Sequence, residues 1–219
     1  MKKRLFVLSS VVMLVLLMTG VGAAEKLIFS ESFENNTVGE NPVEWDLVHP
    51  KAGIVVDGNT ISIPDGKLAL QLNNTPNDMG EVSHEIPEVT LGKLVVNFHQ
   101  PSVSRENINI EVHNADGRIV GIFVTGSGNV RVRDAGEQSS NILNLPNDKW
   151  HTMIIKWDEE LFKVYYLDGA GAEVAITETA KLDPEFAGKP ANKILFNVSK
   201  RDDAKEAFID NIRVYDLAD

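Results

Sequence analysis

The chain has 219 residues, no cysteine and a formal net charge of −11. Because no disulfide can form, the stability of the fold must come from its hydrophobic core. The excess of acidic residues argues against binding to nucleic acid, or to an anionic membrane, through a general positive field. Such a balance fits a protein that binds neutral ligands or cations, or one whose acidity serves only solubility.

The first 24 residues have the pattern of a secretion signal. A basic segment, Lys2 to Arg4, precedes an apolar run over residues 5–18, and the small residues Gly22 to Ala24 then predict cleavage after Ala24. Since a membrane span needs about 20 apolar residues, we expect the leader to be removed rather than kept as an anchor. Removal of its three basic residues takes the net charge from −11 to −14. We therefore expect a secreted or periplasmic protein, without a membrane span, that forms a single domain over residues 25–219.

Short apolar segments separated by turn residues predict an all-β fold. The turn signals include Pro64-Asp65-Gly66 and Asp168-Gly169, and only Lys181–Ala187 has the character of a helical turn. In chain order the predicted strands are Leu27–Phe33, Thr60–Ile63, Lys67–Leu72, Val82–Ile86, Lys93–Gln100, Ile108–Asn114, Ile119–Thr125, Asn129–Asp134, His151–Asp158, Phe162–Asp168, Ile194–Ser199 and Ala207–Tyr215. Their number and regular spacing favour a sandwich or barrel.

Apolar and polar residues alternate in several of these strands, which predicts sheets with one buried and one wet face. The clearest polar positions are Asn97, His99, Asn109, Glu111, His113, Arg131 and Arg133. The hairpin from Trp150 to Gly169 differs, because both of its strands carry apolar residues on both sides. Two stacked antiparallel sheets satisfy both patterns, so we predict a two-sheet antiparallel β-sandwich.

Four segments, in this order, resemble a known group: SESFENNTVGENPVEW, GKLALQL, WHTMIIKWDEELFKVYYLDG and FIDNIRVYD. Over most of Phe29 to Asp216 the chain resembles the concanavalin A-like lectin/glucanase superfamily, in particular its laminin-G-like jelly-roll modules. The calcium-containing carbohydrate-binding modules with galactose-binding-like topology share the start and the end, but the hairpin favours the first group. The resemblance implies a jelly roll and places the chain among lectins, carbohydrate-binding modules, glycoside hydrolases, polysaccharide lyases and adhesion domains.

The polar positions form the candidate ligand site. In jelly-roll carbohydrate binders the exposed face of one sheet holds the sugar, so the resemblance implies that Asn97, His99, Asn109, Glu111, His113, Arg131 and Arg133 bind a poly- or oligosaccharide. An aromatic ring usually stacks on the sugar, and the candidates are Trp45, Phe123 and Tyr165. The alternation of its strand predicts that Phe123 points outwards. The alternative is an ordinary solvated face. A hairpin that places His99 beside Asn109 would leave His113 too far away to share a transition metal with His99.

Glu34 and Asp210 form the candidate metal site. If the first and last strands are antiparallel neighbours, the two carboxyl groups approach each other, and they repel unless one is protonated or a cation lies between them. Calcium, with backbone carbonyls in its shell, would remove this repulsion. The resemblance also implies a structural calcium near the termini. The alternative is that Glu34 and Asp210 are solvated turn residues.

No catalytic motif is visible in the sequence. Retaining glucanases need two carboxylates about 5 Å apart, as E-x-D-x-x-E on one strand provides, and no interior strand has this pattern. A pair drawn from separate strands, Glu111 with Glu81 or Glu85, is the remaining option. We therefore predict a secreted, non-catalytic, lectin-like carbohydrate-binding module. The alternatives are a glycoside hydrolase or polysaccharide lyase of the same superfamily, and an adhesion or assembly module that binds protein.

Overall fold

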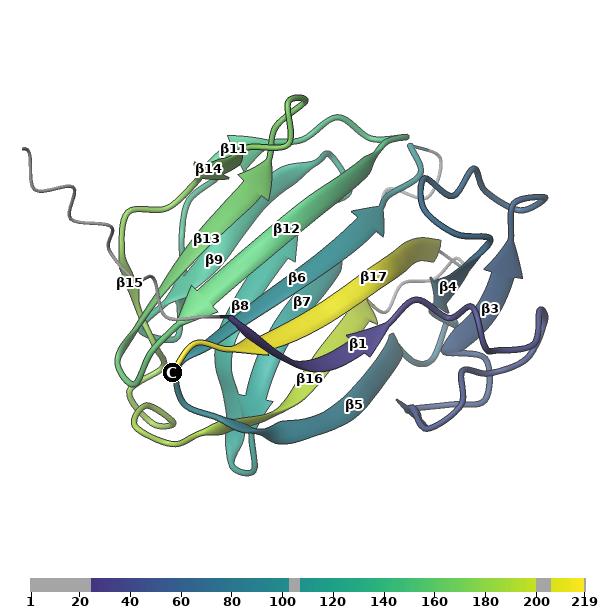
Figure 1. Cartoon of the computed structure of the whole chain (residues 1–219). Helices are drawn as coiled ribbons and strands as arrows, with labels where there is room; N and C mark the ends of the chain where they lie inside the picture. Colours follow the sequence, from purple (N-terminus) through teal and green to yellow (C-terminus); the bar gives the residue numbers. More distant parts are fainter. Residues whose placement is uncertain (1–24, 103–106, 200–205, 219) are drawn as a thin grey trace, which may run out of the picture.

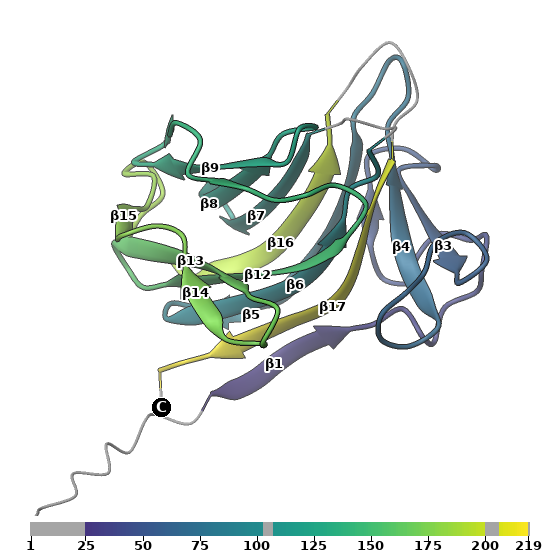
Figure 2. The same cartoon turned by 90° about the horizontal axis from the view of Figure 1, so that it is seen from above.

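The computed structural model describes residues 25–102, 107–199 and 206–218, which form two antiparallel β-sheets stacked face to face. Figure 2 shows the layers, with β7, β8, β9 and β16 in one and β12, β13, β17 and β1 in the other. This confirms the predicted β-sandwich. Within the described ranges there is no α-helix, and thus none that is long and apolar enough to cross a membrane. The predicted leader, residues 1–24, lies outside these ranges.

The first sheet, sheet A, is built around the C-terminal strand. Its order is β14 (Glu173–Ala175), β13 (Leu161–Leu167), β12 (Trp150–Trp157), β6 (Gly92–His99), β17 (Glu206–Asp216), β4 (Leu68–Asn73) and β3 (Gly53–Asp57). Strand β1 (Lys26–Glu31) also pairs with β17, and β15 (Ala180–Lys181) pairs with β13. The predicted hairpin is β12–β13, with Trp157 opposite Phe162.

The second sheet, sheet B, contains the other long strands. Its order is β10 (Glu137–Gln138), β9 (Asn129–Asp134), β8 (Gly117–Val124), β7 (Ile108–Asn114), β16 (Ala191–Val198), β5 (Gly80–Val89) and β2 (Asp46–Leu47). Strand β11 (Leu143–Asn144) pairs with β9.

The first and last strands lie side by side and antiparallel, which meets the condition set for the candidate metal site (Figure 1). Glu31 at the end of β1 is opposite Ile212 of β17. Asp210 lies just before a bulge in β17, where Asn211 has a φ of 50°. The end of β1 and the bulge of β17 therefore lie side by side near the candidate metal site.

One hydrophobic cluster fills the space between the sheets, and it includes Trp45 and Trp157. Because large aromatic side chains favour the core, all three tryptophans, Trp45, Trp150 and Trp157, were expected as core anchors. The ring of Trp157 packs directly on Gly92, the residue opposite it on β6, and a Cβ at Gly92 would collide with it. Trp150 is different, because it is only partly buried and belongs to a small cluster on the outer side of sheet A.

A loop covers part of that outer side. The predicted strand Thr60–Ile63 is wrong, because these residues form no ladder and instead lay Ile61 and Ile63 against Phe208 and its neighbours. The indole nitrogen of Trp150 anchors this loop by donating to the carbonyl of Ser62 at 2.7 Å. The short edge strand β3 precedes the loop and was not predicted. The predicted turn within Lys181–Ala187 exists, and Ala187 N donates to Asp183 O at 2.9 Å.

Candidate functional site

The outward side of sheet B, which we call the B face, carries three rows of polar side chains. Residues directly opposite each other in antiparallel strands point to the same face of the sheet. The register gives a first row of Glu81, Asn197, Asn109, Phe123 and Arg131, a second of Ser83, Leu195, Glu111 and Gly121, and a third of Glu85, Lys193, His113 and Arg118. Arg133 lies beside Gly121, with its Cδ 3.8 Å from the position of a Cβ there. The B face thus holds five of the predicted ligand residues: Asn109, Glu111, His113, Arg131 and Arg133.

The other two predicted ligand residues lie elsewhere. Asn97 and His99 are on β6 in sheet A, so the expectation that all seven residues share one face is wrong, as is the register placing His99 beside Asn109. Asn97 lies opposite Thr152 and Asp210, and it accepts a hydrogen bond from Thr152 Oγ1 at 2.7 Å. His99 lies opposite Trp150 and Phe208. Alternation correctly assigns a side chain to a polar face, but it does not say to which sheet that face belongs.

Glu111 is a buried carboxyl of the B face that contacts two basic side chains. Its side chain is 9% exposed, with Oε2 2.8 Å from His113 Nε2 and Oε1 3.1 Å from Arg118 Nη1. Burial acts to raise the pKa of this carboxyl, but the hydrogen bond from His113 and the charge of Arg118 outweigh it and lower the pKa. Glu111 is therefore an ionised acceptor in a fixed position.

The pKa of Glu81 shifts in the opposite direction, upwards. Burial raises the pKa of its carboxyl, and the negative charge of Glu111 raises it further, while His113 and Lys193 act against the change. The two carboxyls come from strands β5 and β7, which both pair with β16. Carboxyl groups whose pKa values are moved apart can serve as an acid and a base.

The aromatic side chain of the B face is Phe123, which is half-buried between Asn109 and Arg131 in its row. It points outwards, because Ile122 and Val124 on either side of it belong to the core. Asn109 Nδ2 donates to Asn197 Oδ1 at 2.6 Å, and Arg131 Nε donates to Asn141 Oδ1 at 2.7 Å. The ring is thus flanked by side chains that neighbouring residues hold in place.

Asp210 lies on the outer side of sheet A and is fully buried. Its Oδ1 accepts a hydrogen bond from the Asn211 amide at 2.7 Å, but Oδ2 has no hydrogen-bond partner. Burial raises the pKa of Asp210 to about 7, against the Asn211 amide, and the charges of Glu34, Asp65 and Glu31 add to the rise. A buried, unpaired carboxylate oxygen in acidic surroundings has the chemistry of a cation ligand.

Glu34 lies near this region, but its carboxyl group already accepts hydrogen bonds from the backbone. Its Oε1 accepts hydrogen bonds from the amides of Lys67 at 2.6 Å and Leu68 at 2.8 Å. Gly66, with a φ of +82°, has no room for a Cβ because the Glu34 carboxyl lies against it. In the part of the chain that the structure describes, no group of three or more His, Asp or Glu side chains could hold a metal ion. A cation at Asp210 would therefore depend on backbone carbonyls for most of its shell.

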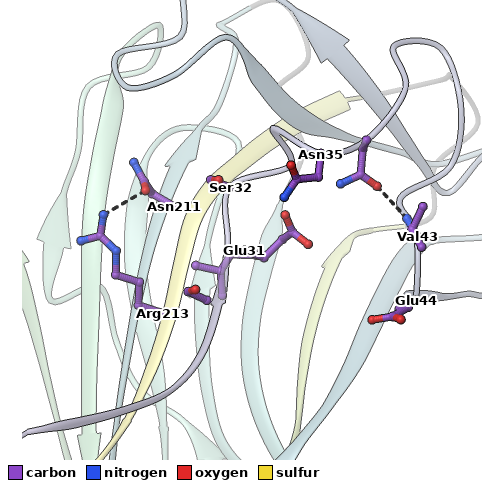
Figure 3. Close-up of a pocket in the computed structure, with 10 residues that line it drawn as sticks. Glu31, Ser32, Asn35, Val43, Glu44, Asn211 and Arg213 are labelled. Carbon is purple, nitrogen blue, oxygen red and sulfur yellow. Dashed lines mark hydrogen bonds between the residues drawn. The ribbon is translucent and has the colours of Figure 1, made fainter.

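A polar pocket of about 510 Å³ lies beside the β17 bulge (Figure 3). Glu31 and Glu44 both line it, and Arg213 Nη2 donates to Asn211 Oδ1 at 3.0 Å on its other side (Figure 3). Phe33, Glu44 and Asn211 all have positive φ values, of 60°, 65° and 50°. Such backbone conformations are costly for residues other than glycine and gather at sites that the surrounding structure holds in place.

Several B-face residues were not predicted, among them Lys193, Asn197 and Arg118. Glu81 was expected only as a catalytic partner of Glu111, but alternation in β5 also assigns it to the polar face, because Glu81 and Ser83 flank the core residue Val82. Arg118 could not be found in this way. It reaches the B face only because of a register shift between Val112 and His113, which places Arg118 rather than Ile119 opposite His113.

No protein-family model matches the chain, and no curated protein matches it. Solved structures do. A sialidase aligns over 88% of this chain with a TM-score of 0.68 at 13% identity, and the alignment spans 19% of the sialidase chain. The catalytic domain of a glycoside hydrolase family 131 protein from Coprinopsis cinerea aligns over 86% of this chain and 94% of its own, with a TM-score of 0.61 at 8% identity.

A Bacillus licheniformis β-glucanase also aligns, over 86% of this chain and 97% of its own, with a TM-score of 0.54 at 18% identity. At these identities the similarity shows the fold alone. The neighbours share the all-β jelly-roll sandwich that the sequence predicted.

Proposed function

We propose that this protein binds a poly- or oligosaccharide on the B face without cleaving it. The fold supports a carbohydrate ligand, because the structures it resembles include a glycoside hydrolase catalytic domain and a β-glucanase. Within this fold we assign the chain to the laminin-G-like branch, on the strength of the Trp150–Gly169 hairpin. The leader pattern at residues 1–24 supports a secreted or periplasmic location, where polysaccharides are accessible.

The observation that carries the proposal is the row around Phe123. A half-buried ring that faces outwards can stack on the apolar side of a sugar, while polar side chains beside it bind the hydroxyls. Asn109 and Arg131 flank this ring directly, and the fixed carboxylate of Glu111 lies in the next row. An ordinary solvated face needs no outward aromatic ring held between ordered polar groups.

We also propose a structural calcium ion at Asp210. The free Oδ2 of this buried side chain, together with the nearby charges of Glu34 and Asp65, fits a cation. Glu34 would contribute through its charge, since Oε1 already accepts two backbone hydrogen bonds. When bound, the ion would neutralise a buried carboxylate and secure the junction of the first and last strands.

A second candidate function, glycoside hydrolysis, is favoured by one observation. The raised pKa of Glu81 and the lowered pKa of Glu111 are the split that a general acid and its ionised partner require. Against this, Glu111 is engaged by both His113 and Arg118, which reduces its availability as a nucleophile or base.

The experiment is a glycan panel that scores retained binding and released reducing ends together. We expect binding without release, and we expect Phe123→Ala to weaken binding by about tenfold or more, the value of a buried aromatic contact. Tyr165→Ala, on the outer side of sheet A, is the matched control and should bind normally. Release of reducing ends that is abolished by Glu81→Gln would instead establish the hydrolase. No binding to any glycan would contradict both functions and favour a protein-binding role.

A further inference from the structure

The two arginines of β9 are unusual cations on this acidic chain. The protein has 32 acidic and 21 basic residues, so an arginine at the surface has many carboxylates available to it. Arg118 pairs with Glu111, but across the residues that the structure describes neither Arg131 nor Arg133 lies in an ion pair. Their hydrogen bonds go to neutral oxygens, from Arg131 Nε to Asn141 Oδ1 at 2.7 Å and from Arg133 Nη1 to Gly136 O at 3.4 Å. Each guanidinium therefore keeps N–H donors for an anion.

Both arginines lie near Phe123, the ring on which we propose that the sugar stacks. Arg131 is the direct cross-strand neighbour of Phe123, and Arg133 lies next to Gly121. Gly121 has no side chain, and the stems of two arginines close in on it. A Cβ there would be 2.9 Å from Arg118 Cδ and 3.8 Å from Arg133 Cδ. The B face is therefore lowest at Gly121. The ring of Phe123 lies on one side of this position, and the side chains of Arg118 and Arg133 lie next to it.

The positive charges of Arg131 and Arg133 are not neutralised by ion pairs with described residues. Glu111, the carboxylate of the neighbouring row, is already paired with Arg118 and His113, so the β8–β9 side of the B face keeps the positive charge of Arg131 and Arg133. The planar fork of a guanidinium matches a carboxylate or sulfate group in two parallel hydrogen bonds, which a neutral hydroxyl cannot provide. The net negative charge of the whole chain opposes general binding of polyanions, so any such binding must be local.

The geometry points to an anionic glycan, one that carries carboxylate or sulfate groups, as the ligand of the B face, with Arg131 and Arg133 as the residues that select the charge. This inference rests on the proposed function, since it assigns a ligand class to the same face. A sugar ring over Phe123 would direct its anionic substituent towards these two guanidinium groups.

The test uses two matched pairs of polymers and protein recovered from a host that expresses the full chain. One pair is polygalacturonate and its fully methyl-esterified form, and the other is a sulfated galactan and its desulfated form. We expect at least one charged polymer to bind about tenfold or more tightly than its neutralised partner. Arg131→Gln and Arg133→Gln should each weaken that binding by about tenfold, the value of one charge-assisted hydrogen bond, and should barely change the neutral form. The pair that responds identifies carboxylate or sulfate as the group recognised.

Two control variants keep the result interpretable. Arg213→Gln removes an exposed arginine of sheet A that bonds to Asn211, and it should bind like the unchanged protein. Arg131→Lys keeps the charge and loses the fork, so it should bind with intermediate affinity even if Arg131→Gln folds poorly.

Equal affinity for charged and neutral polymers, with both weakened by Phe123→Ala, would overturn the inference and leave the proposed function standing. Equal losses in Arg131→Gln and Arg213→Gln would overturn it as non-specific attraction of polyanions. No binding of any of the four polymers would overturn the inference and also count against the proposed function.

Discussion

Glu111 and Arg118 form an ion pair across β7 and β8, with 3.1 Å between Glu111 Oε1 and Arg118 Nη1. The two residues can meet because β8 accommodates one extra residue opposite the step from Val112 to His113. Without that bulge Arg118 would point into the core and Ile119 would point out. A single irregularity in one strand therefore sets the charge distribution at the centre of the B face.

The first prediction concerns acid stability. The folded-state pKa of Glu111 lies below its ordinary value of 4.5, so its contribution is fully present above that value and is lost as pH falls through the folded pKa. Between about pH 5 and pH 3 the melting temperature of the unchanged protein should therefore fall more steeply than that of Glu111→Gln. Glu137→Gln, at an exposed position in β10, is the matched control. Parallel pH profiles for all three proteins would show that the pair contributes no linked stability.

The second prediction concerns calcium. Saturating calcium should raise the melting temperature by several degrees and EDTA should reverse the rise, because a ligand that binds only the folded state adds to its stability. Asp210→Asn should remove the response, since the free Oδ2 is lost as an anionic ligand. Glu44→Gln, which changes the charge of the neighbouring pocket, should retain it. A calcium response that persists in Asp210→Asn would place the ion elsewhere.

A third prediction tests the register between β6 and β12. Gly92 faces Trp157, and the indole ring fills the space of a side chain. Gly92→Ala should lower the free energy of unfolding by about 1–3 kcal/mol, the usual cost of overpacking a core. Gly169→Ala is the control, because nothing lies within 4 Å of a Cβ at that turn position. Equal denaturant midpoints for the two variants would contradict the packing of Trp157 on Gly92.

A fourth prediction concerns Gly121, the position on the B face that has no side chain. A methyl group at Gly121 would press on the flexible stem of Arg118, 2.9 Å away, and would narrow the space in front of Arg133. Because a flexible stem can move, Gly121→Ala should change the free energy of unfolding by less than about 1 kcal/mol. Affinity for the glycan should fall several-fold. Calorimetric titration together with a thermal melt would separate the two effects, and unchanged affinity would place the ligand away from Gly121.

The sandwich was predicted well from the sequence because the alternation of apolar residues in its long strands is a local feature. Leu94, Val96 and Phe98 occupy alternate positions among Lys93, Asn97 and His99, whichever strand pairs with them. The β12–β13 hairpin contains its turn within one continuous segment. The loop at Thr60–Ile63 was predicted as a strand because its two isoleucines alternate with Ser62, and in the structure they pack on the outer side of sheet A without joining a ladder.

The candidate site was harder to predict, because it depends on which strands become neighbours. Asn97 and Asn109 have the same local pattern, yet pairing places one in sheet A and the other in sheet B. Glu81 reaches the B face through β16, which lies more than a hundred residues later in the chain. Local periodicity carries no information about such pairings.

The most direct test of the account compares the two outer faces with matched double variants. Asn109→Ala with Phe123→Ala removes an amide and a ring from the B face, and Asn97→Ala with Tyr165→Ala removes the same groups from sheet A. Both proteins should first show cooperative thermal melts, and their affinities for a retained glycan should then be measured side by side. The account predicts that the B-face variant loses binding by about a hundredfold while the sheet A variant keeps it. Loss of binding in the sheet A variant alone would contradict the account and move the ligand to the opposite side of the sandwich.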